Sequence, residues 1–259
     1  MGYKNFAIDI AKQAGEIIKT QFAFGMAKQY KELDHSPVTE TDLQINSLVV
    51  KAIKENFSDH DIVGEEESDN SKKSDYIWYC DPIDGTIPFS NGIPICTFSL
   101  ALVYKGQPIL GVVYEPFMDN TYVAEKNKGA FRNKQPIHVS KNPDIKGQII
   151  ALEHWSAAKF DFSKMYGALE KDLIKTLKFC SFIYKSVLVA NGELIGSIFP
   201  HNTAHDLAAI KIIIEEAGGK TTDLYGNEID FNKEINGFVA SNGLVHDYIL
   251  KKIKENVKL

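Results

Sequence analysis

The chain has 259 residues, enough to bury a sizeable core, and its 44% hydrophobic and 24% charged residues are ordinary values for a globular protein. A net charge of -5 without a basic cluster argues against a nucleic-acid-binding surface. No apolar run approaches the ~18 residues of a membrane span, and three cysteines without a CxxC pair favour a reducing, cytoplasmic environment over a disulfide framework.

Two amphipathic helices are predicted near the N-terminus. Apolar residues recur at helical spacing from residue 3 to about residue 24. A polar loop over residues 30–37 separates this first helix from a second helix that begins close to Asp42. Thr41 and Gln44 have the spacing of a capping box, which places Asp42 in the first turn, where the helix dipole favours a carboxylate even without a catalytic role.

Acidic residues then follow two apolar segments. Residues 62–63 predict a short strand that leads into Gly64 and the cluster Glu65–Glu67, a kind of charge run that is usually a solvated loop. Residues 76–80 predict a buried strand. This strand is expected to stop at Asp81, because the following proline cannot donate to a sheet ladder.

The turn after that strand has the residue types of a metal and phosphate site. Asp81 and Asp84 lie three residues apart, and carboxylates at the end of a strand favour hard cations such as Mg²⁺. Gly85 allows the backbone to approach a ligand closely, and Thr86 adds a hydroxyl group. Composition alone leaves open the alternative of a simple turn, since Asp, Pro and Gly are all turn formers.

The remaining segments predict strands and helices on either side of one internal boundary. Strands over residues 96–104 and 109–114, joined by a hairpin turn, begin an antiparallel sheet that residues 121–124 and 130–131 extend. The polar stretch at residues 140–147 marks the boundary. It divides the chain into an N-terminal α+β half, residues 1–142, and a C-terminal α/β half, residues 143–259.

The C-terminal half is expected to alternate strands and helices. In order, the pattern predicts a strand at 149–152, a helix at 160–169, a helix from 186, a strand at 194–199, a long helix capped by residues 203–206, a strand at 238–240 and a helix at 246–254. Helices and sheets in layers make the predicted fold class α+β.

The ordered motifs Gly64–Glu66, Asp81–Thr86 and His205–Ala209, followed by Glu216–Gly219, resemble those of the inositol monophosphatase family. This family belongs to the magnesium-dependent, lithium-sensitive phosphomonoesterases, and the resemblance extends over about residues 37–242. It implies a layered α-β-α-β-α sandwich of the inositol monophosphatase and sugar phosphatase type. It also implies a homodimer that hydrolyses a small phosphate ester with Mg²⁺.

The resemblance implies a ligand set for two or three Mg²⁺ ions. Glu65, Asp81 and the carbonyl of Ile83 would hold one ion, Asp81 would bridge to a second ion held by Asp84 and Asp206, and Glu65 would assist a third. The chemistry agrees with this assignment. Two carboxylates about 4 Å apart repel by roughly 4 kcal/mol at an effective dielectric near 20, so a crevice that gathers several of them is tolerable mainly when cations fill it.

The resemblance also implies catalytic roles. Thr86, hydrogen-bonded to Asp42, would orient and deprotonate a metal-bound water for in-line attack on phosphorus, with Glu65 as a further catalytic group. The backbone N–H groups of Gly85 and Thr86 would hold phosphate oxygens, with Asp84 also in contact with the substrate. Glu66 would help to orient the metal-binding residues without binding an ion itself.

The substrate side departs from the family pattern. His205 stands where members usually carry Trp, and Phe199 stands where inositol phosphatases carry a Glu that binds ring hydroxyls. The small-residue segment that lines the inositol pocket is replaced by residues 180–185, in which Ser181 and Lys185 are candidate substrate contacts. An aromatic side chain in place of a hydroxyl-binding acid disfavours inositol phosphate itself.

The sequence therefore predicts Mg²⁺-dependent hydrolysis of a small sugar or polyol phosphate, similar to inositol 1-phosphate. Fructose 1,6-bisphosphate, histidinol phosphate and a 3′-phosphonucleotide are alternative substrates. A non-enzymatic alternative is a catalytically silent regulatory partner. The presence of all the predicted metal-binding acids argues against this alternative. A calcium-binding module is disfavoured because no EF-hand loop is present. Neither nucleic acid nor a membrane is expected as a partner.

Overall fold

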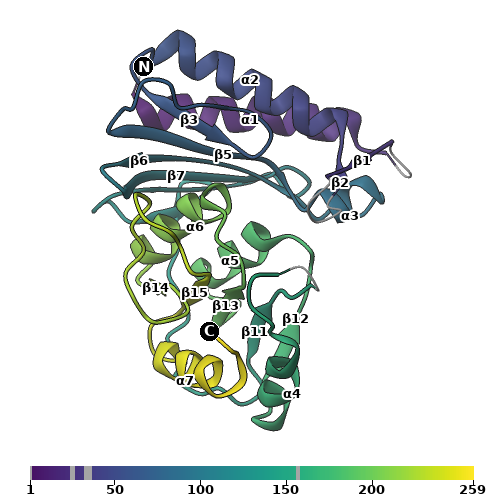
Figure 1. Cartoon of the computed structure of the whole chain (residues 1–259), viewed down its shortest axis with the longest axis vertical. Helices are drawn as coiled ribbons and strands as arrows, with labels where there is room; N and C mark the ends of the chain where they lie inside the picture. Colours follow the sequence, from purple (N-terminus) through teal and green to yellow (C-terminus); the bar gives the residue numbers. More distant parts are fainter. Residues whose placement is uncertain (1, 24–26, 32–36, 156–157) are drawn as a thin grey trace.

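Helices and sheets alternate in five layers in the computed structural model, which describes residues 2–23, 27–31, 37–155 and 158–259 (Figure 1). The helical layers are formed by α1 (Tyr3–Gln21) with α2 (Glu40–Asn56), by α5 (Phe182–Ala190) with α6 (Ala204–Glu216), and by α4 (Ser163–Lys171) with α7 (His246–Asn256). A sheet lies between each pair of helical layers. The predicted α-β-α-β-α sandwich is thereby confirmed.

The first sheet has eight strands. In spatial order they are β10 (Gln135–Pro136), β9 (Ala130–Arg132), β8 (Asn120–Glu125), β7 (Gln107–Glu115), β6 (Thr97–Tyr104), β5 (Tyr76–Asp84), β3 (Asp61–Gly64) and β4 (Ser68–Asp69). The predicted hairpin and the strands that extend it are confirmed. The sheet is not purely antiparallel, however, because β3 pairs with β5 in parallel.

The second sheet has five strands, in the order β12 (Lys175–Leu177), β11 (Ile149–Leu152), β13 (Gly196–Phe199), β15 (Phe238–Ser241) and β14 (Lys220–Thr222). A short pair, β1 (Gln29–Tyr30) with β2 (Pro37–Val38), and the helix α3 (Thr86–Ser90) complete the described elements. Most of the loop predicted over residues 30–37 lies outside the described residues, as does residue 24. No described helix combines the length and the apolar character needed to cross a membrane.

Side chains of the central strands alternate between the two faces of the first sheet. Trp78 of β5 and Leu100 of β6 pack in the core beneath α1 and α2, whereas Tyr79 and Ala101 pack in the core that contains α5 and α6. Successive side chains of a strand point to opposite faces. Asp81 therefore shares the face of Tyr79 and points toward the α5–α6 layer.

Strand β5 does not end at Asp81, so that prediction is wrong. Asp81 pairs with Ser99 of β6, the register then shifts, and pairing resumes between Asp84 and Thr97. Pro82 lies inside this bulge, where the ladder needs no N–H donor. The bulge therefore keeps both aspartates on the strand while changing the direction in which the second one points.

Helix α2 begins two residues earlier than the proposed Thr41–Gln44 capping box required, and that capping box is wrong. Thr39 is the N-cap residue, and its N–H donates to the carboxylate of Asp42 at 2.8 Å. Thr41 lies inside the helix and donates to Gln21 Oε1 at 2.8 Å. The prediction that Asp42 lies in the first turn is confirmed.

Helix α5 begins at Phe182 and not at residue 186. The carboxylate of Asp84 accepts the backbone N–H groups of Phe182 at 2.7 Å and Tyr184 at 3.1 Å, which satisfies donors of the first turn. The division of the chain near residue 142 stays a prediction. Helices α5 and α6 of the second half contact strands of the first sheet.

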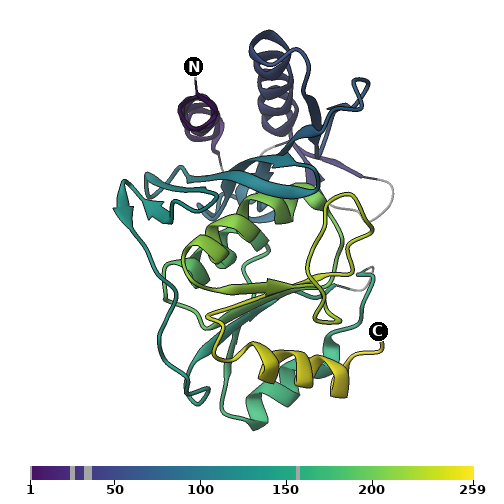
Figure 2. The ribbon, with the colours of Figure 1, turned by 90° about the vertical axis from the view of Figure 1, so that its left-hand side faces the viewer.

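Helix α6 lies between the two sheets, and its composition reflects that position (Figure 2). Every residue from Leu207 to Ile214 is buried. A helix that is apolar on all sides is stable only when it is covered on all sides. At Gly111 of β7 the sheet approaches α6 closely, since a Cβ there would lie 2.7 Å from the carbonyl oxygen of Ala209.

We expect Gly111→Ala to lower the free energy of unfolding by about 1–3 kcal/mol, because the backbone of α6 must move to admit the methyl group. Gly167→Ala in α4 is the matched control, since nothing lies within 4 Å of its added Cβ. This control should be neutral or stabilising by up to about 1 kcal/mol. Urea denaturation of both variants checks the prediction, and equal effects of the two substitutions would contradict it.

Candidate functional site

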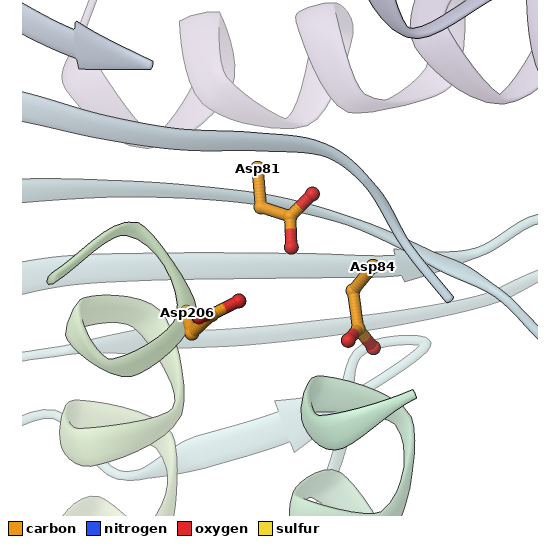
Figure 3. A group of neighbouring side chains, drawn as sticks. All are labelled: Asp81, Asp84 and Asp206. Atoms are coloured by element: carbon orange, nitrogen blue, oxygen red, sulfur yellow. The ribbon is translucent and has the colours of Figure 1, made fainter. Parts of the chain in front are cut away.

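Three aspartates from the two halves of the chain converge on one space (Figure 3). Asp81 and Asp84 come from β5, and Asp206 comes from the first turn of α6. One carboxylate oxygen from each lies within 4.8 Å of the other two. The bulge in β5 and the packing of α6 on the sheet thus bring together residues that are more than a hundred positions apart.

Asp81 is buried and incompletely satisfied. Its Oδ1 atom has no hydrogen-bond partner among the described residues. Burial, followed by the negative charges of Glu65 and Asp206, raises the pKa of Asp81 well above its usual range. An orphaned buried carboxylate oxygen is unfavourable unless a cation or a proton meets it.

Asp84 is buried and fully bonded. Its Oδ1 accepts the N–H of Phe182, and its Oδ2 accepts the N–H of Tyr184, the hydroxyl of Thr97 at 3.1 Å and the hydroxyl of Ser181. Burial raises the pKa of Asp84 to about 6 even though these hydrogen bonds act in the opposite direction. Asp84 therefore joins β5 of the first sheet to the N-terminus of α5.

Asp206 lies at the N-terminus of α6, where the helix dipole favours a carboxylate. The hydroxyl of Thr203 donates to it, and Nε2 of His205 lies 3.9 Å from its Oδ2. Burial is the largest influence on the pKa of Asp206 and raises it, while His205 acts to lower it. His205 is thus beside the aspartates, as its sequence position suggests.

Glu65 and Glu66 are held by a lysine that the sequence analysis did not identify. Nζ of Lys31 lies 2.7 Å from Glu65 and 2.8 Å from Glu66. Burial lowers the pKa of Lys31, but the two carboxylates outweigh that effect and raise it overall. Glu65 is not part of the group formed by the three aspartates, so its role as a metal ligand stays a prediction.

Thr86 lies next to Asp42, as predicted. Its hydroxyl oxygen is 3.2 Å from Asp42 Oδ1 and 2.9 Å from the carbonyl oxygen of Ile83. A hydroxyl has one hydrogen, so Thr86 donates to only one of these acceptors at a time. Burial raises the pKa of Asp42 to about 6, against the hydrogen bonds from Thr39.

Gly85 cannot be replaced without strain. Its φ of 94° lies in the left-handed region. An added Cβ would be 2.8 Å from the carbonyl oxygen of Ile95 and 2.9 Å from the Cβ of Ser181. Glycine is therefore required where the turn after β5 meets the start of α5.

A pocket of about 270 Å³ opens beside Asp84 and Asp206. Phe199 and Ser181 line it, as the sequence suggested, but Glu153, Trp155 and Lys178 were missed. A signal for one of these exists, because Glu153 comes directly after a strand, as Glu65 does, and Trp155 follows two residues later. Nothing in the local sequence around Lys178 indicates a pocket residue.

Lys185 is not free to meet a substrate anion, which corrects the sequence-based picture. Its side chain is fully buried, its ammonium pairs with Glu153, and it is not among the residues that line the pocket. The ammonium also lies 5.6 Å from the ring centroid of Phe182. Lys185 therefore acts on the pocket indirectly, through the lining residues Glu153 and Phe182.

The donor set of the three aspartates suits a metal ion. All of its donor atoms are carboxylate oxygens. Hard divalent cations prefer such oxygen ligands to soft sulfur ligands. Oδ1 of Asp81 has no hydrogen-bond partner among the described residues, and the pKa values of Asp81 and Asp84 are raised. Both observations mean that the protein alone does not compensate the negative charge of the ionised carboxylates. The residues present therefore fit a hard divalent cation.

Known proteins similar to this chain cover almost its whole length. The chain matches the model of the inositol monophosphatase family over residues 3–258. It is 32% identical to a fructose-1,6-bisphosphatase/inositol-1-monophosphatase of Thermotoga maritima, over 98% of this chain and 96% of that one. It is 28% identical to a histidinol-phosphatase of Chlorobaculum parvum, over 91% of this chain and 90% of that one. The structure is similar to that of an IMPase of Thermotoga maritima, with a TM-score of 0.88, 31% identity and 98% coverage of both chains.

The raised pKa of Asp84 makes a prediction for the protein held in EDTA. Its folded-state pKa of about 6 lies above the unfolded value of 3.8, so its stabilising contribution is complete below pH 3.8 and is lost as the pH rises through 6. Asp84→Asn cannot ionise. We expect wild type to lose on the order of 3 kcal/mol more unfolding free energy than Asp84→Asn between about pH 4 and pH 7.5.

Urea denaturation at the two pH values measures this difference, in which any pH-independent effect of the substitution cancels. Parallel losses in the two proteins would contradict the prediction. Saturating Mg²⁺ should recover much of the wild-type loss at the higher pH, because a bound cation offsets the charge of the ionised carboxylate.

Proposed function

The chain belongs to the inositol monophosphatase family, and from that premise we propose that it is a phosphoric monoester hydrolase that uses Mg²⁺ to hydrolyse small phosphate esters. The observation that carries the proposal is the convergence of Asp81, Asp84 and Asp206 from two halves of the chain. The names of the relatives, which denote phosphatases of sugar, polyol and amino-alcohol phosphates, support the same reaction.

Electrostatics explains why an acidic pocket would serve a phosphate substrate. A phosphate monoester is an anion, and three neighbouring carboxylates would repel it. Charges about 4 Å apart interact by roughly 4 kcal/mol at an effective dielectric near 20. Cations held by Asp81, Asp84 and Asp206 reverse the sign of this interaction, so metal binding and substrate binding are coupled.

The side chains around the aspartates divide the work of the reaction. Bound Mg²⁺ supplies a water with a lowered pKa and neutralises charge on the leaving oxygen. Thr86 is placed to accept a proton from the attacking water and to pass its own hydroxyl proton to Asp42, 3.2 Å away. Asp42 is a suitable acceptor because its pKa, raised to about 6, lies near neutrality. The new P–O bond forms to the water oxygen as the ester P–O bond breaks.

Further properties are part of the proposal. We carry over Mg²⁺ as the ion, inhibition by Li⁺ and assembly as a homodimer from the family resemblance. A cytoplasmic location is supported by the free thiols of Cys80, Cys96 and Cys180.

Metal removal tests the proposal directly. With glycerol 2-phosphate as substrate, we expect phosphate release to stop in excess EDTA, to return with millimolar Mg²⁺ and to fall when Li⁺ is added. Asp84→Asn should lose more than about 99% of the activity at any Mg²⁺ concentration, because it loses a charged ligand. Asp172→Asn, at the distant end of α4, should keep wild-type activity.

Phosphate release in a colorimetric assay measures the three conditions and the two variants. Full turnover in EDTA would contradict the mechanism. A protein that binds Mg²⁺ calorimetrically but hydrolyses no ester in a broad panel would instead be the catalytically silent partner.

The role of Thr86 makes a separate prediction. Thr86→Ala removes the proton relay and should lower kcat by about 10²- to 10⁴-fold with little effect on Mg²⁺ affinity. Thr86→Ser retains the hydroxyl and should keep most of the activity. Steady-state kinetics and calorimetric Mg²⁺ titration of the two variants check this, and equal kcat values for alanine and serine would refute the relay.

A further inference from the structure

The pocket beside the aspartates has an aromatic wall. Phe182 and Phe199 are stacked, with ring centroids 4.1 Å apart and planes inclined by 17°. Trp155 continues the wall, its ring centroid 5.9 Å from that of Phe199. All three residues line the pocket. Their rings come from three separate segments of the chain, and their accessible parts give this side of the pocket an apolar lining. Phe182 and Phe199 are 3% and 7% exposed, and the ring of His201 is stacked on that of Trp155 with the ring centroids 5.8 Å apart.

Among the described residues that line the pocket, few polar groups besides the aspartates are available to a substrate. Lys178 donates to the carbonyl oxygen of His154 at 2.6 Å, and the hydroxyl of Ser181 donates to Asp84. Glu153 is the remaining charged group of the lining. A polyol ring carries hydroxyl groups around its rim, and each one buried here without a partner would weaken binding. A flat aromatic ring makes no such demand and gains from stacking on the wall.

Glu153 is built into the pocket as a fixed acceptor. It is 4% exposed, and both hydrogen bonds that the described residues donate to it, from the N–H of Cys180 and the ammonium of Lys185, end on Oε1. Its Oε2 is thus available to a donor in the pocket. The buried ammonium of Lys185 neutralises the pair, so Glu153 can face an arriving phosphate ester without repelling it as a lone charge would.

On the premise of the proposed phosphatase activity, we propose that this pocket selects phosphate monoesters whose alcohol carries a flat nitrogen heterocycle. The ring packs against Trp155 and Phe199, and an N–H of the heterocycle or of its exocyclic amine donates to Glu153. The phosphate then lies toward Asp84 and Asp206. Polyol and sugar phosphates are poorer substrates of this chain, because the wall leaves their hydroxyl groups unpaired.

A substrate panel tests the proposal with the Mg²⁺-loaded wild-type protein. Histidinol phosphate and adenosine 3′-monophosphate represent heterocycle esters, and inositol 1-phosphate and fructose 1,6-bisphosphate represent polyol esters. Glycerol 2-phosphate, a small ester without a ring, is the common reference for activity at the metal centre. At least one heterocycle ester should exceed both polyol esters in kcat/KM by about 10-fold or more.

The outcomes separate this proposal from the proposed function. Hydrolysis of glycerol 2-phosphate with polyol esters equal to or better than both heterocycle esters overturns the heterocycle preference and leaves the phosphatase activity standing. No hydrolysis of any of the five esters overturns both.

Substitution of the wall supplies a matched pair of variants. Phe199→Leu should lower the ratio of kcat/KM for the preferred heterocycle ester to that for glycerol 2-phosphate by about 10-fold, through loss of stacking. Phe231→Leu makes the same chemical change in the same core but outside the pocket lining, so it should leave the ratio unchanged. Equal ratios in the two variants would overturn the stacking role.

The acceptor is tested by removing Glu153 and Lys185 together, because removing one alone leaves an unpaired buried charge. The double variant Glu153→Leu/Lys185→Met should also lower the ratio by about 10-fold, with an unchanged circular dichroism spectrum. A folded double variant with the wild-type ratio overturns the role of Glu153. If it does not fold, the comparison of Phe199→Leu with Phe231→Leu decides the proposal.

Discussion

Buried negative charge is the constraint on which the rest of this structure depends. Asp81, Asp84 and Asp206 meet between the two sheets, where burial and mutual repulsion disfavour their ionised forms. The surrounding helices stabilise part of this negative charge. The N-terminus of α5 donates two N–H groups to Asp84, and the dipole of α6 favours Asp206. Asp81 receives no comparable support at Oδ1, which is the atom most in need of a cation.

The predictable part of the site is the part encoded by local sequence. Asp42 lies in a first helical turn, and Asp84 precedes a glycine whose conformation only glycine adopts easily. Such features depend on neighbours a few residues away, so spacing and turn chemistry identify them. The layered fold was likewise predictable, because the apolar periods of its helices and strands are strong. The end of β5 was not, since the bulge at Pro82 exists only because β6 continues to pair beyond it.

The unpredictable part depends on contacts across the chain. The start of α5 is set by Asp84, which lies 98 positions before Phe182 in the sequence. Lys31, which follows β1, meets Glu65 34 positions later in the sequence. The sequence likewise offered Lys185 as a candidate substrate contact, and nothing in the local sequence indicates its partner Glu153, 32 positions earlier. In each case a polar side chain acts on a partner that no local pattern specifies.

The two lysine pairs also explain how an acidic region can be selective about where cations bind. Lys31 lies between Glu65 and Glu66 and compensates part of their charge, and Lys185 pairs with Glu153. Among the described residues, no lysine or arginine pairs with Asp81, Asp84 or Asp206, and Nε2 of His205 lies 3.9 Å from Asp206. A divalent ion therefore gains most by binding among Asp81, Asp84 and Asp206. Glu65, Glu66 and Glu153 each face a lysine, and Asp42 is held by hydrogen bonds from Thr39 and Thr86. Within the pocket, Lys185 compensates the charge of Glu153, while Asp84 and Asp206 line the end proposed to bind metal and phosphate. The proposed selection of the organic part of a substrate by shape, packing and hydrogen bonding is thus separated from the holding of its phosphate by charge.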